Sequence, residues 1–370
     1  MKIGILGGGQ LGRMLIQEAL KYDDEFHTLD PNSDCSCAQI STFTQGNFND
    51  FQSVVDFGKD KDVVSIEIEH VSVAALEELE NQGIKVIPSS NIIKTIQQKI
   101  LQKEFYKKNG IPSPDFQIIQ SLDDEIKIDF PFVQKLNTGG YDGKGVQIIR
   151  TADDVEKMWD EPSVLENLVD IEKELSIIIA KNEAGEIKTF PVTEMIADPK
   201  LNLLDFNICP AEISADVQQQ IDKIAEQFMT AANSAGLFAI ELFLDKQGKV
   251  WVNETAPRLH NSGHQTQEGN ANSQFEQFYR VLKNLPLADT SMKQFSGMLN
   301  LVGEENYSGK VKYEGLENVL KLPNAYVHLY GKTETKPGRK MGHINVLANS
   351  REELLEQLIY IKSLVKVIAE

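Results

Sequence analysis

Cysteine and long apolar runs are scarce in this chain of 370 residues. Its three cysteines, Cys35, Cys37 and Cys209, are too few and too unevenly spaced for a disulfide scaffold, which fits a reducing compartment. The Cys35-x-Cys37 pair lacks a second pair, which argues against a cysteine-based metal site. No apolar run approaches the length needed to cross a membrane, and the stretch 2–6 is too short for the core of a secretory signal. We therefore expect a cytoplasmic protein without a membrane partner.

Positive charge is also in deficit. The chain carries 37 Lys and Arg residues against 55 Asp and Glu residues, a net charge of −18. Proteins that bind nucleic acid need a basic face, so nucleic acid is excluded as the main partner. A small anionic substrate remains compatible, because it needs only a local basic pocket. The hydrophobic fraction of 41% is that of a globular protein, and the length predicts two or three domains.

The pattern of apolar runs divides the chain into three parts. Residues 1–95 alternate short apolar runs with helical patterns, which predicts a doubly wound α/β unit. Its expected strands are Ile3–Leu6, Phe26–Leu29, Val63–Ile68 and Val86–Ile87. Residues 96–180 predict a small α+β unit with a helix over Ala152–Trp159. A further helix is expected over Asn91–Asn109, across the boundary with the first part. Residues 181–370 predict further strands, with helices over Ala215–Ala235 and Arg351–Leu364.

A glycine fingerprint follows the first expected strand and opens a helix. Gly7, Gly9 and Gly12 have the spacing of a dinucleotide-binding loop, and Asp30 ends the next strand, near the place of a ribose-binding acid. A nicotinamide- or flavin-dependent enzyme is therefore one interpretation. The helix N-terminus would bind any phosphate or carboxylate equally well, and Gln10 at the loop tip could reach such a ligand. A tight turn that binds nothing is the third reading.

A second glycine-rich loop, Thr138–Gly145, lies between two expected strands. It is not a Walker loop, because Lys144 is followed by glycine and no helix follows. Its backbone N–H groups could cradle phosphates, although solvent-exposed Asp-Gly hairpin tips are common. Lys135 favours the phosphate reading, since a lone lysine at the end of an apolar strand is costly to bury without an anion. Lys99, on the preceding expected helix, could also contact phosphates, or it could simply lie on a helix face exposed to solvent.

Two glutamates follow apolar runs further along this unit. Glu166 ends one such run and could offer a carboxylate to an adenine, with Glu174 taking ribose hydroxyls. The sequence supports equally well that both are ordinary surface glutamates that bind no nucleotide.

Two more glutamates belong to one expected hairpin, whose turn is Asp245–Gly248. If Leu244 pairs with Lys249, Glu241 and Glu254 point to the same face as diagonal neighbours, roughly 7 Å apart at Cβ. A bulge would break this register. Two carboxylates on one apolar face repel each other, and Mg²⁺ with bound phosphates resolves the repulsion. A pair of edge glutamates facing water is the alternative.

The loop after this hairpin carries one permanent cation and two imidazoles. His260 and His264 have the spacing of a zinc helix, but the intervening Asn261, Ser262 and Gly263 break helices and include no glutamate. With Arg258, the loop suits a small planar anion such as bicarbonate. A basic turn near the C-terminus indicates that the substrate carries a phosphate. The alternative is a charged loop that only faces solvent. Its cations are Lys332, Lys336, Arg339 and Lys340.

Four segments carry a resemblance to a known family. They are GGGQLGR at Gly7–Arg13, GGYDGKG at Gly139–Gly145, NETAPRLHNSGH at Asn253–His264 and KPGRKMGH at Lys336–His343. They resemble the ATP-dependent 5-(carboxyamino)imidazole ribonucleotide synthases of purine biosynthesis, in the ATP-grasp superfamily, over nearly the whole chain. The resemblance implies an α/β and α+β ATP-grasp fold. Its parts are a Rossmann-like (pre-ATP-grasp) domain at 1–95, a lid region at 96–180 and a C-terminal half at 181–370.

The resemblance also implies site residues and ligands. ATP would be held by Lys99, Lys135, Gly140, Tyr141, Asp142, Gly143, Lys144, Gly145, Val146, Glu166, Val169, Glu174, Asn253 and Glu254. Mg²⁺, or Mn²⁺ in its place, would be held by Glu241 and Glu254. The catalytic residues around bicarbonate and the carboxylated intermediate would be Arg258, His260, Asn261, His264 and Lys135. Aminoimidazole ribonucleotide would contact Gln10, Leu11, Glu69, Lys336 and Arg339. A homodimer is expected on the same basis.

Some positions depart from the family pattern. Glu67-Ile-Glu69 is followed by His70 where asparagine is frequent, and Leu136-Asn137 stands where arginines are frequent. Met195-Ile-Ala197 replaces an Asn-x-His segment. Contacts at these positions are therefore left open.

Three rival functions remain open from the sequence. The first is another ATP-grasp carboxylase or ligase. A biotin carboxylase, as one example, would need a biotin carrier with a Met-Lys-Met target, which Met292-Lys293 does not complete. An NAD-dependent oxidoreductase and a non-catalytic nucleotide sensor are the others, and nucleotide preference and turnover would separate them.

Overall fold

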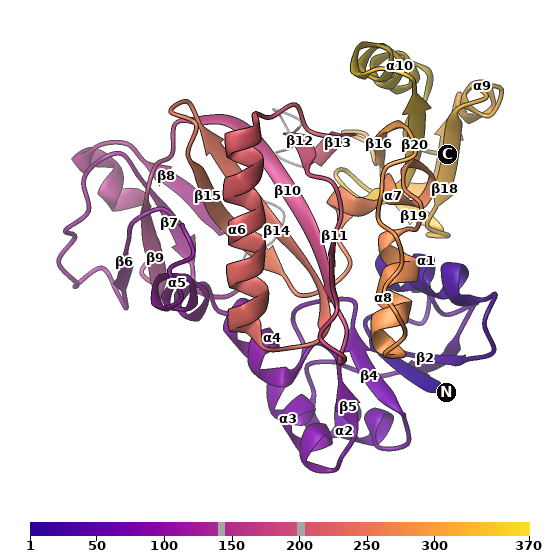
Figure 1. Ribbon diagram of the computed structural model, residues 1–370, viewed down its shortest axis with the longest axis horizontal. Helices are drawn as coiled ribbons and strands as arrows, with labels where there is room; N and C mark the ends of the chain where they lie inside the picture. Colours follow the sequence, from indigo (N-terminus) through magenta and orange to yellow (C-terminus); the bar gives the residue numbers. More distant parts are fainter. Residues whose placement is uncertain (140–144, 198–203) are drawn as a thin grey trace.

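The computed structural model describes residues 1–139, 145–197 and 204–370. Within these residues a long central sheet joins an N-terminal parallel unit, a small lid sheet and a C-terminal unit (Figure 1). In this described part, no helix is long and apolar enough to cross a membrane.

The N-terminal unit confirms the expected doubly wound pattern. Its five parallel strands lie in the order β3-β2-β1-β4-β5, and each expected apolar run forms one of them. Thr42–Gln45, which forms β3, was missed because this edge strand is polar and mostly exposed. The elements are β1 (Lys2–Leu6), α1 (Gln10–Ala19), β2 (Glu25–Asp30), β3 (Thr42–Gln45), α2 (Phe51–Gly58), β4 (Val63–Ile66), α3 (Val73–Asn81) and β5 (Lys85–Val86).

The single helix expected over Asn91–Asn109 is wrong. The chain forms α4 (Ser90–Gln97) and α5 (Lys99–Lys108), with Gln98 extended between them. The break is stabilised by Asn137, whose carbonyl accepts from the Lys99 N–H (2.9 Å) and whose Oδ1 accepts from the Ile100 N–H (3.1 Å). Because the first N–H groups of a helix lack partners inside it, this contact allows α5 to start anew at Lys99. Asn137, the residue that follows the lid strand Phe132–Leu136, thus fixes the position of Lys99.

The lid is a four-stranded sheet in the order β6-β9-β7-β8. Its elements are β6 (Phe116–Ile119), β7 (Phe132–Leu136), β8 (Val146–Ile149), the 3₁₀ helix η1 (Ala152–Lys157) and β9 (Ser163–Asn167). The helix expected over Ala152–Trp159 is therefore a shorter 3₁₀ helix, opened by a capping box between Thr151 and Asp154. A small apolar core lies on this sheet, formed by Ile119, Phe132, Ile149, Met158 and Leu165.

The central sheet has nine strands within the described residues and runs through the middle of the molecule. Seven are β10 (Ile171–Lys181), β11 (Ile187–Thr189), β12 (Thr193–Ala197), β13 (Leu204–Cys209), β14 (Gly236–Asp245), β15 (Val250–Ala256) and β16 (Phe295–Val302). The other two are β20 (Lys340–Ala348) and β18 (Ala325–Leu329). Residue 180 lies inside β10, so the expected division between the second and third parts falls at the end of a central strand.

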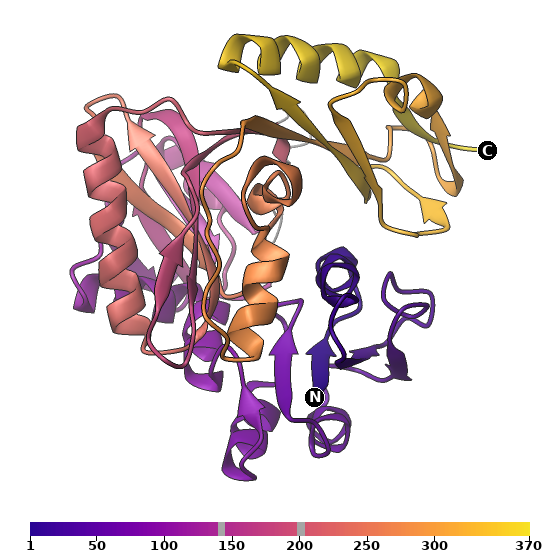
Figure 2. The same cartoon turned by 45° about the vertical axis from the view of Figure 1, so that its right-hand side comes forward.

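Helices cover both faces of this sheet (Figure 2). The amphipathic α6 (Ala215–Ala232) packs its apolar face against β10, β14 and β15, and ends before Ala235 because Asn233 takes a left-handed conformation with φ 44°. On the other face, α8 (Gln274–Leu282) packs between β10, β14 and helix α1 of the N-terminal unit. Sequence analysis did not predict α8.

The remaining elements lie between β15 and β16 in the chain or follow β16. They are η2 (Asn261–Gly263), α7 (Thr266–Gly269), β17 (Gly309–Glu314), α9 (Leu316–Val319), β19 (Glu334–Thr335), α10 (Arg351–Leu364) and β21 (Lys366–Ala369). Helix α10 has the expected bounds and buries Leu354, Leu358 and Ile361 against the end of the central sheet.

The β14–β15 hairpin has the expected turn but another register. The Asp245 carboxylate accepts from the backbone N–H groups of Gln247 and Lys249, both at 2.9 Å. The expected pairing of Leu244 with Lys249 is wrong, because Leu244 pairs with Val250. Beyond Leu242 the register shifts again through a bulge.

Candidate active site

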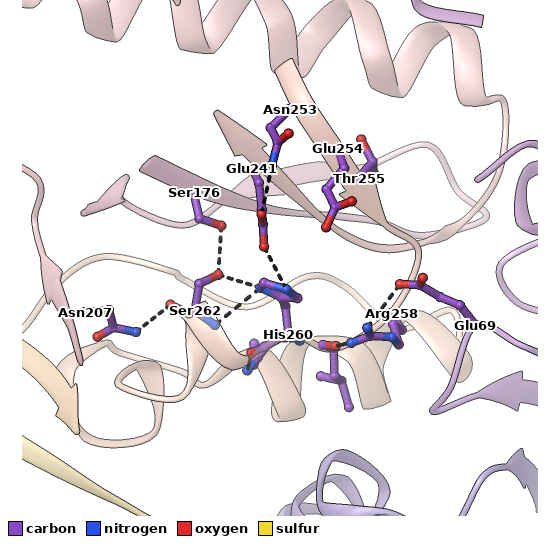
Figure 3. A network of polar contacts seen from close by, with 12 residues as sticks. Glu69, Ser176, Asn207, Glu241, Asn253, Glu254, Thr255, Arg258, His260 and Ser262 are labelled. Atoms are coloured by element: carbon purple, nitrogen blue, oxygen red, sulfur yellow. Dashed lines mark hydrogen bonds and ion pairs between the residues drawn. The ribbon is translucent and has the colours of Figure 1, made fainter. Parts of the chain in front are cut away.

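The bulge in the β14–β15 hairpin places two carboxylates face to face. Glu241 pairs directly with Glu254, and Asn253 is the extra residue of the bulged strand, β15. The Asn253 Nδ2 donates to Glu241 Oε2 at 3.4 Å, so the bulged side chain turns back towards the pair (Figure 3). The two glutamates are therefore closer neighbours than the diagonal arrangement expected from the sequence.

Each of these carboxylates has a nitrogen partner. Lys99 forms an ion pair with Glu254, and His260 Nε2 lies 3.3 Å from Glu241 Oε1. The attraction of Lys99 lowers the pKa of Glu254 to about 2, even though burial opposes this shift. Burial opposes charge on Lys99, but Glu254 outweighs it and raises the pKa of Lys99. In this structure Lys99 thus supplies the positive charge next to Glu254.

The donor set fits a hard divalent cation. Glu241, Glu254 and the amide of Asn253 offer oxygen ligands, which Mg²⁺ prefers, and phosphates commonly complete such a shell. Among the described residues, no group of three or more His, Cys, Asp or Glu side chains is arranged to hold a metal alone. A site with two carboxylates is consistent with this finding, because phosphate oxygens would fill the remaining coordination positions of the metal ion.

A buried charged triad lies beside this pair. Lys135 Nζ donates to Asn253 Oδ1 at 2.8 Å and lies 3.1 Å from Glu166 Oε2. Lys103 Nζ lies 3.0 Å from Glu166 Oε1, and all three charged side chains are buried. Burial lowers the pKa of Lys103 to about 8, and the two lysines outweigh burial to lower the pKa of Glu166. Lys103 was missed, although its place four residues after Lys99 on one helix face was the available signal.

The other residues expected to hold the nucleotide are spread around this triad. Glu174 on β10 is half-buried, and its pKa is raised by burial and then by the charge of Glu241. Val169 is half-buried between β9 and β10, and Val146 is exposed at the start of β8. The Gly145 carbonyl accepts from the Leu136 N–H at 2.9 Å. Gly140, Tyr141, Asp142, Gly143 and Lys144 lie outside the described residues.

The loop with two histidines forms a short 3₁₀ helix rather than a zinc helix. The Ser262 hydroxyl lies 2.9 Å from His260 Nδ1 and 2.8 Å from the Ser176 hydroxyl, so the other ring nitrogen of His260 faces Glu241 (Figure 3). Arg258 reaches Glu69 with an Nη2 to Oε1 distance of 3.1 Å. The loop therefore brings Glu69 of the N-terminal unit to the edge of the carboxylate site.

Three buried side-chain nitrogens of this loop lack hydrogen-bond partners, and one of them is Arg258 Nε. Asn261 Nδ2 and His264 Nε2 are buried and make no hydrogen bond within the described structure. Unpaired buried polar atoms are rare in native proteins, and they indicate a place for a ligand atom. Both atoms can donate, so an anion is the matching ligand.

The N-terminal glycine loop already contains carboxylates. Glu67 Oε1 accepts from the Leu11 N–H at 3.1 Å, and a side chain on Gly9 would meet Glu67 Oε2 at 2.8 Å. Asp30 Oδ2 accepts from the Gly8 N–H at 2.8 Å. Burial raises the pKa of Glu67. Because Glu67 occupies the helix N-terminus where a dinucleotide's pyrophosphate would bind, the geometry argues against the oxidoreductase reading.

The basic turn near the C-terminus lies against this glycine loop. Lys332 Nζ donates to Gln10 Oε1 at 3.1 Å and to the Lys340 carbonyl at 2.7 Å. Burial, followed by the neighbouring Arg339, lowers the pKa of Lys332 to about 8. Arg339 donates to the Glu334 carbonyl at 2.8 Å, and Lys336 is exposed on the same turn. Gln10 and the basic turn, far apart in the sequence, thus form one surface.

The fold and these carboxylates define an ATP-grasp protein. An ATP-grasp domain model matches residues 104–275, a ribonucleotide synthetase preATP-grasp domain matches 1–97, and a phosphoribosylaminoimidazole carboxylase C-terminal domain matches 296–357. Together they cover most of the chain. More specifically, the chain belongs to the N5-carboxyaminoimidazole ribonucleotide synthase family and is an ATP-dependent ligase.

Relatives of known structure and name support this membership. The N5-carboxyaminoimidazole ribonucleotide synthetase of Thermotoga maritima is 41% identical, with a TM-score of 0.92 over 100% of this chain and 99% of that one. The synthase of Aquifex aeolicus is 33% identical over 99% of this chain and 97% of its own length. An Aspergillus clavatus synthase, solved with ADP and 5-aminoimidazole ribonucleotide, is 32% identical with a TM-score of 0.86 over 98% of each chain.

The chain also matches longer proteins. It spans 69% of the phosphoribosylaminoimidazole carboxylase of Ogataea methanolica and 66% of that of Candida glabrata, at 33% and 35% identity.

Proposed function

We propose that this chain carboxylates the exocyclic amine of 5-aminoimidazole ribonucleotide in purine biosynthesis, using ATP and bicarbonate. The products are 5-carboxyaminoimidazole ribonucleotide, ADP and phosphate. One observation carries the proposal: Glu241 and Glu254 face each other across the hairpin, next to the loop that carries Asn261 and His264. Buried nitrogen atoms of these two loop residues have no hydrogen-bond partner. A phosphate-binding cation site and an anion-binding loop in contact suit the transfer of phosphate to a small anion. The ADP and 5-aminoimidazole ribonucleotide bound to the Aspergillus clavatus synthase support the same substrates.

The nucleotide half of the site lies around the buried triad. Lys99, Lys103 and Lys135 bring three cations near the carboxylate pair, and the loop 139–145 joins the strands that carry Lys135 and Val146. Glu166, Val169 and Glu174 would contact the adenosine portion. Glu241, Glu254 and Asn253 would hold Mg²⁺ or Mn²⁺, and the ion would neutralise charge on the transferring phosphoryl group.

The chemistry proceeds in two steps. A bicarbonate oxygen attacks the γ-phosphorus of ATP and the bond to ADP breaks, which gives carboxyphosphate. The amine nitrogen of the ribonucleotide then forms a bond to the carboxyl carbon, directly or after its release as CO₂. The bond between this carbon and the phosphate oxygen breaks, and the departing phosphate takes up the proton that the amine loses. The chain forms no bond itself: Arg258, His260, Asn261 and His264 hold the anion and Lys135 stabilises charge. Carboxyphosphate hydrolyses in water, so closure of the lid sheet must exclude solvent.

The ribonucleotide would bind between the glycine loop and the basic turn. Its phosphate would meet Lys332, Lys336 and Arg339, while Gln10, Leu11 and Glu69 would contact the rest. The hydrogen bond between Lys332 of the basic turn and Gln10 of the glycine loop supports this placement, because one ligand could contact both segments there. The amine would then face Arg258, which Glu69 contacts.

We further propose that the protein acts in the cytoplasm as a homodimer, without nucleic acid or membrane partners. The net charge of −18 and the family resemblance support this part of the proposal. Light scattering coupled to gel filtration would measure the dimer, and a monomeric mass would contradict it.

The experiment that tests the function measures ADP released from ATP and Mg²⁺, with bicarbonate and aminoimidazole ribonucleotide added or omitted. We expect fast release only when both are present, matched by an acid-labile carbamate product. Release that is indifferent to the ribonucleotide would overturn the substrate. An absence of release would overturn the synthase reading and favour a nucleotide sensor.

A further inference from the structure

Gln274, the first residue of α8, is a fully buried side chain whose amide orientation is fixed by the backbone. Its Oε1 accepts from the His260 N–H at 3.0 Å, and its Nε2 donates to the His260 carbonyl at 2.7 Å. A flipped amide would place like groups against each other at both contacts. The network therefore identifies which end of the amide carries the protons.

This fixed amide determines which nitrogen of His264 carries a proton. Gln274 Nε2 lies 3.4 Å from His264 Nδ1, and its second proton is free to point there. Because that nitrogen can only donate, His264 Nδ1 must accept, and the proton of the neutral ring lies on Nε2. An imidazolium would set two N–H groups against each other. Burial of the ring, followed by the nearby His260, also lowers the pKa of His264 well below its usual value.

Two neighbouring rings pack against the ring of His264 and hold it in this orientation. Phe275 stacks on it with a centroid distance of 5.9 Å, and His343 stacks on it at 4.5 Å. His343 is itself held by the Tyr330 hydroxyl (3.0 Å from Nδ1) and by Gln267 Oε1 (3.2 Å from Nε2). The proton on Nε2 of His264 therefore points in one direction, from a buried atom that makes no hydrogen bond in the described structure.

Gly263 makes this close approach possible. A side chain on Gly263 would lie 2.8 Å from the Gln274 Cδ atom and would also collide with Ile178. The glycine of the loop thus serves the contact between Gln274 and the two histidines that flank it.

We propose that Gln274 is a positioning residue for the carboxylation, which sets the tautomer of His264 so that its Nε2–H donates to an oxygen of the bicarbonate-derived anion. The inference rests on the proposed function for the identity of that anion. It assigns His264 the role of a neutral hydrogen-bond donor rather than of a base, since the lone pair of the ring is already engaged by Gln274. A preorganised donor of this kind stabilises developing negative charge without reorganisation.

The tautomer can be measured without substrates. Histidine-selective ¹⁵N labelling gives six ring systems, and His264→Gln identifies the signals of His264. We expect a neutral ring with a protonated Nε2 in the full-length protein near pH 7. The isosteric change Gln274→Glu replaces the donor by an acceptor, and it should move the proton to Nδ1 or charge the ring. A protonated Nδ1 in the unaltered protein, or no change in Gln274→Glu, would overturn the inference.

Gln277 offers a matched control on the same helix. It is also fully buried, and its amide makes the same paired contacts with the backbone of Ala288, at 2.8 and 3.2 Å. Gln277→Glu should destabilise the fold to a similar degree and leave the His264 signals unchanged. Equal changes of these signals in both variants would show a general packing effect and overturn the role of Gln274.

Kinetics separate a donor from a base. The amide nitrogen of a glutamine can reach the place of Nε2, whereas that of an asparagine reaches only the place of Nδ1. We expect His264→Asn to lower kcat roughly 10²-fold, with His264→Gln recovering most of the loss and the KM for ATP unchanged in both. Equal losses would overturn the donor role. If the unaltered protein shows the expected tautomer but no carboxylation, the proposed function fails and the inference about the anion fails with it, while the Gln274–His264 contact stands.

Discussion

Asn253 connects the lid to the carboxylate pair, since its Oδ1 accepts from Lys135 at 2.8 Å while its Nδ2 donates to Glu241 at 3.4 Å. It can make both contacts because it is the extra residue of the bulge in β15. Lys135 belongs to β7 of the lid sheet and Glu241 to β14 of the central sheet. Movement of the lid must therefore change the surroundings of the carboxylates that would hold the metal.

The ion pair between Lys99 and Glu254 predicts competition between a lysine and a metal. Without nucleotide, a divalent cation has to displace Lys99 from Glu254. We expect Lys99→Met to tighten Mn²⁺ binding in the absence of ATP by about tenfold, equivalent to ~1.4 kcal/mol. Electron paramagnetic resonance of free Mn²⁺ measures this directly.

A matched control for this change is Lys94→Met, an exposed lysine on the preceding helix that pairs with Glu77. It should leave Mn²⁺ binding as it was. Unchanged Mn²⁺ binding in Lys99→Met would show that Lys99 does not compete for the metal.

The buried triad predicts a large loss of stability from a conservative change. Glu166→Gln removes the carboxylate that Lys103 and Lys135 share, and leaves two buried ammonium groups without a counter-charge. Removal of one partner from a buried ion pair costs about 3–5 kcal/mol of unfolding free energy. We expect thermal unfolding to show this loss. Glu172→Gln, on the exposed start of β10, is the control and should stay within ~0.5 kcal/mol. Similar unfolding of both variants would contradict the prediction.

The sequence predicts the elements better than it predicts their contacts. The parallel strands of the N-terminal unit and helix α10 follow from local periodicity, because their apolar faces repeat along the chain. The polar strand β3 has no such repeat. The break at Gln98 was missed because it depends on Asn137, almost 40 residues later in the sequence.

The site shows the same division. The pattern of apolar residues in the hairpin predicts that Glu241 and Glu254 share one face. The bulge that places them directly opposite each other has no signal of its own in the sequence. Gln274 was missed because its role comes from the backbone of His260, to which it is brought by the packing of α8. From the sequence alone, Glu67 is named only within the segment Glu67-Ile-Glu69 and is assigned no contact. Its hydrogen bond with the Leu11 N–H depends on the parallel pairing of β1 with β4.

The glycine loop predicts that the N-terminal site serves the ribonucleotide and not a dinucleotide. A side chain on Gly9 would collide with both carboxylate oxygens of Glu67. We expect Gly9→Ala to raise the KM for the ribonucleotide by about tenfold, a cost of ~1.4 kcal/mol, because it displaces Glu67 and the start of α1. The KM for ATP should stay constant, since the nucleotide half of the site lies elsewhere. Steady-state kinetics with each substrate varied in turn measure both, and tight binding of NADH would contradict the assignment of the loop.

The surroundings of Lys332 predict how ribonucleotide binding changes with pH. Burial and the neighbouring Arg339 lower the pKa of Lys332 from 10.5 to about 8. Its positive charge is therefore complete below about pH 7 and is lost as the pH rises through 8. A phosphate monoester carries its second negative charge above about pH 6, so the attraction is greatest between these two values. We expect the KM for the ribonucleotide to rise above pH 8, while that for ATP does not. Arginine keeps its charge throughout this range, so Lys332→Arg should abolish the rise. Lys336→Arg, an exposed lysine of the same turn, should retain it. A rise that persists in Lys332→Arg would assign the titration to another group.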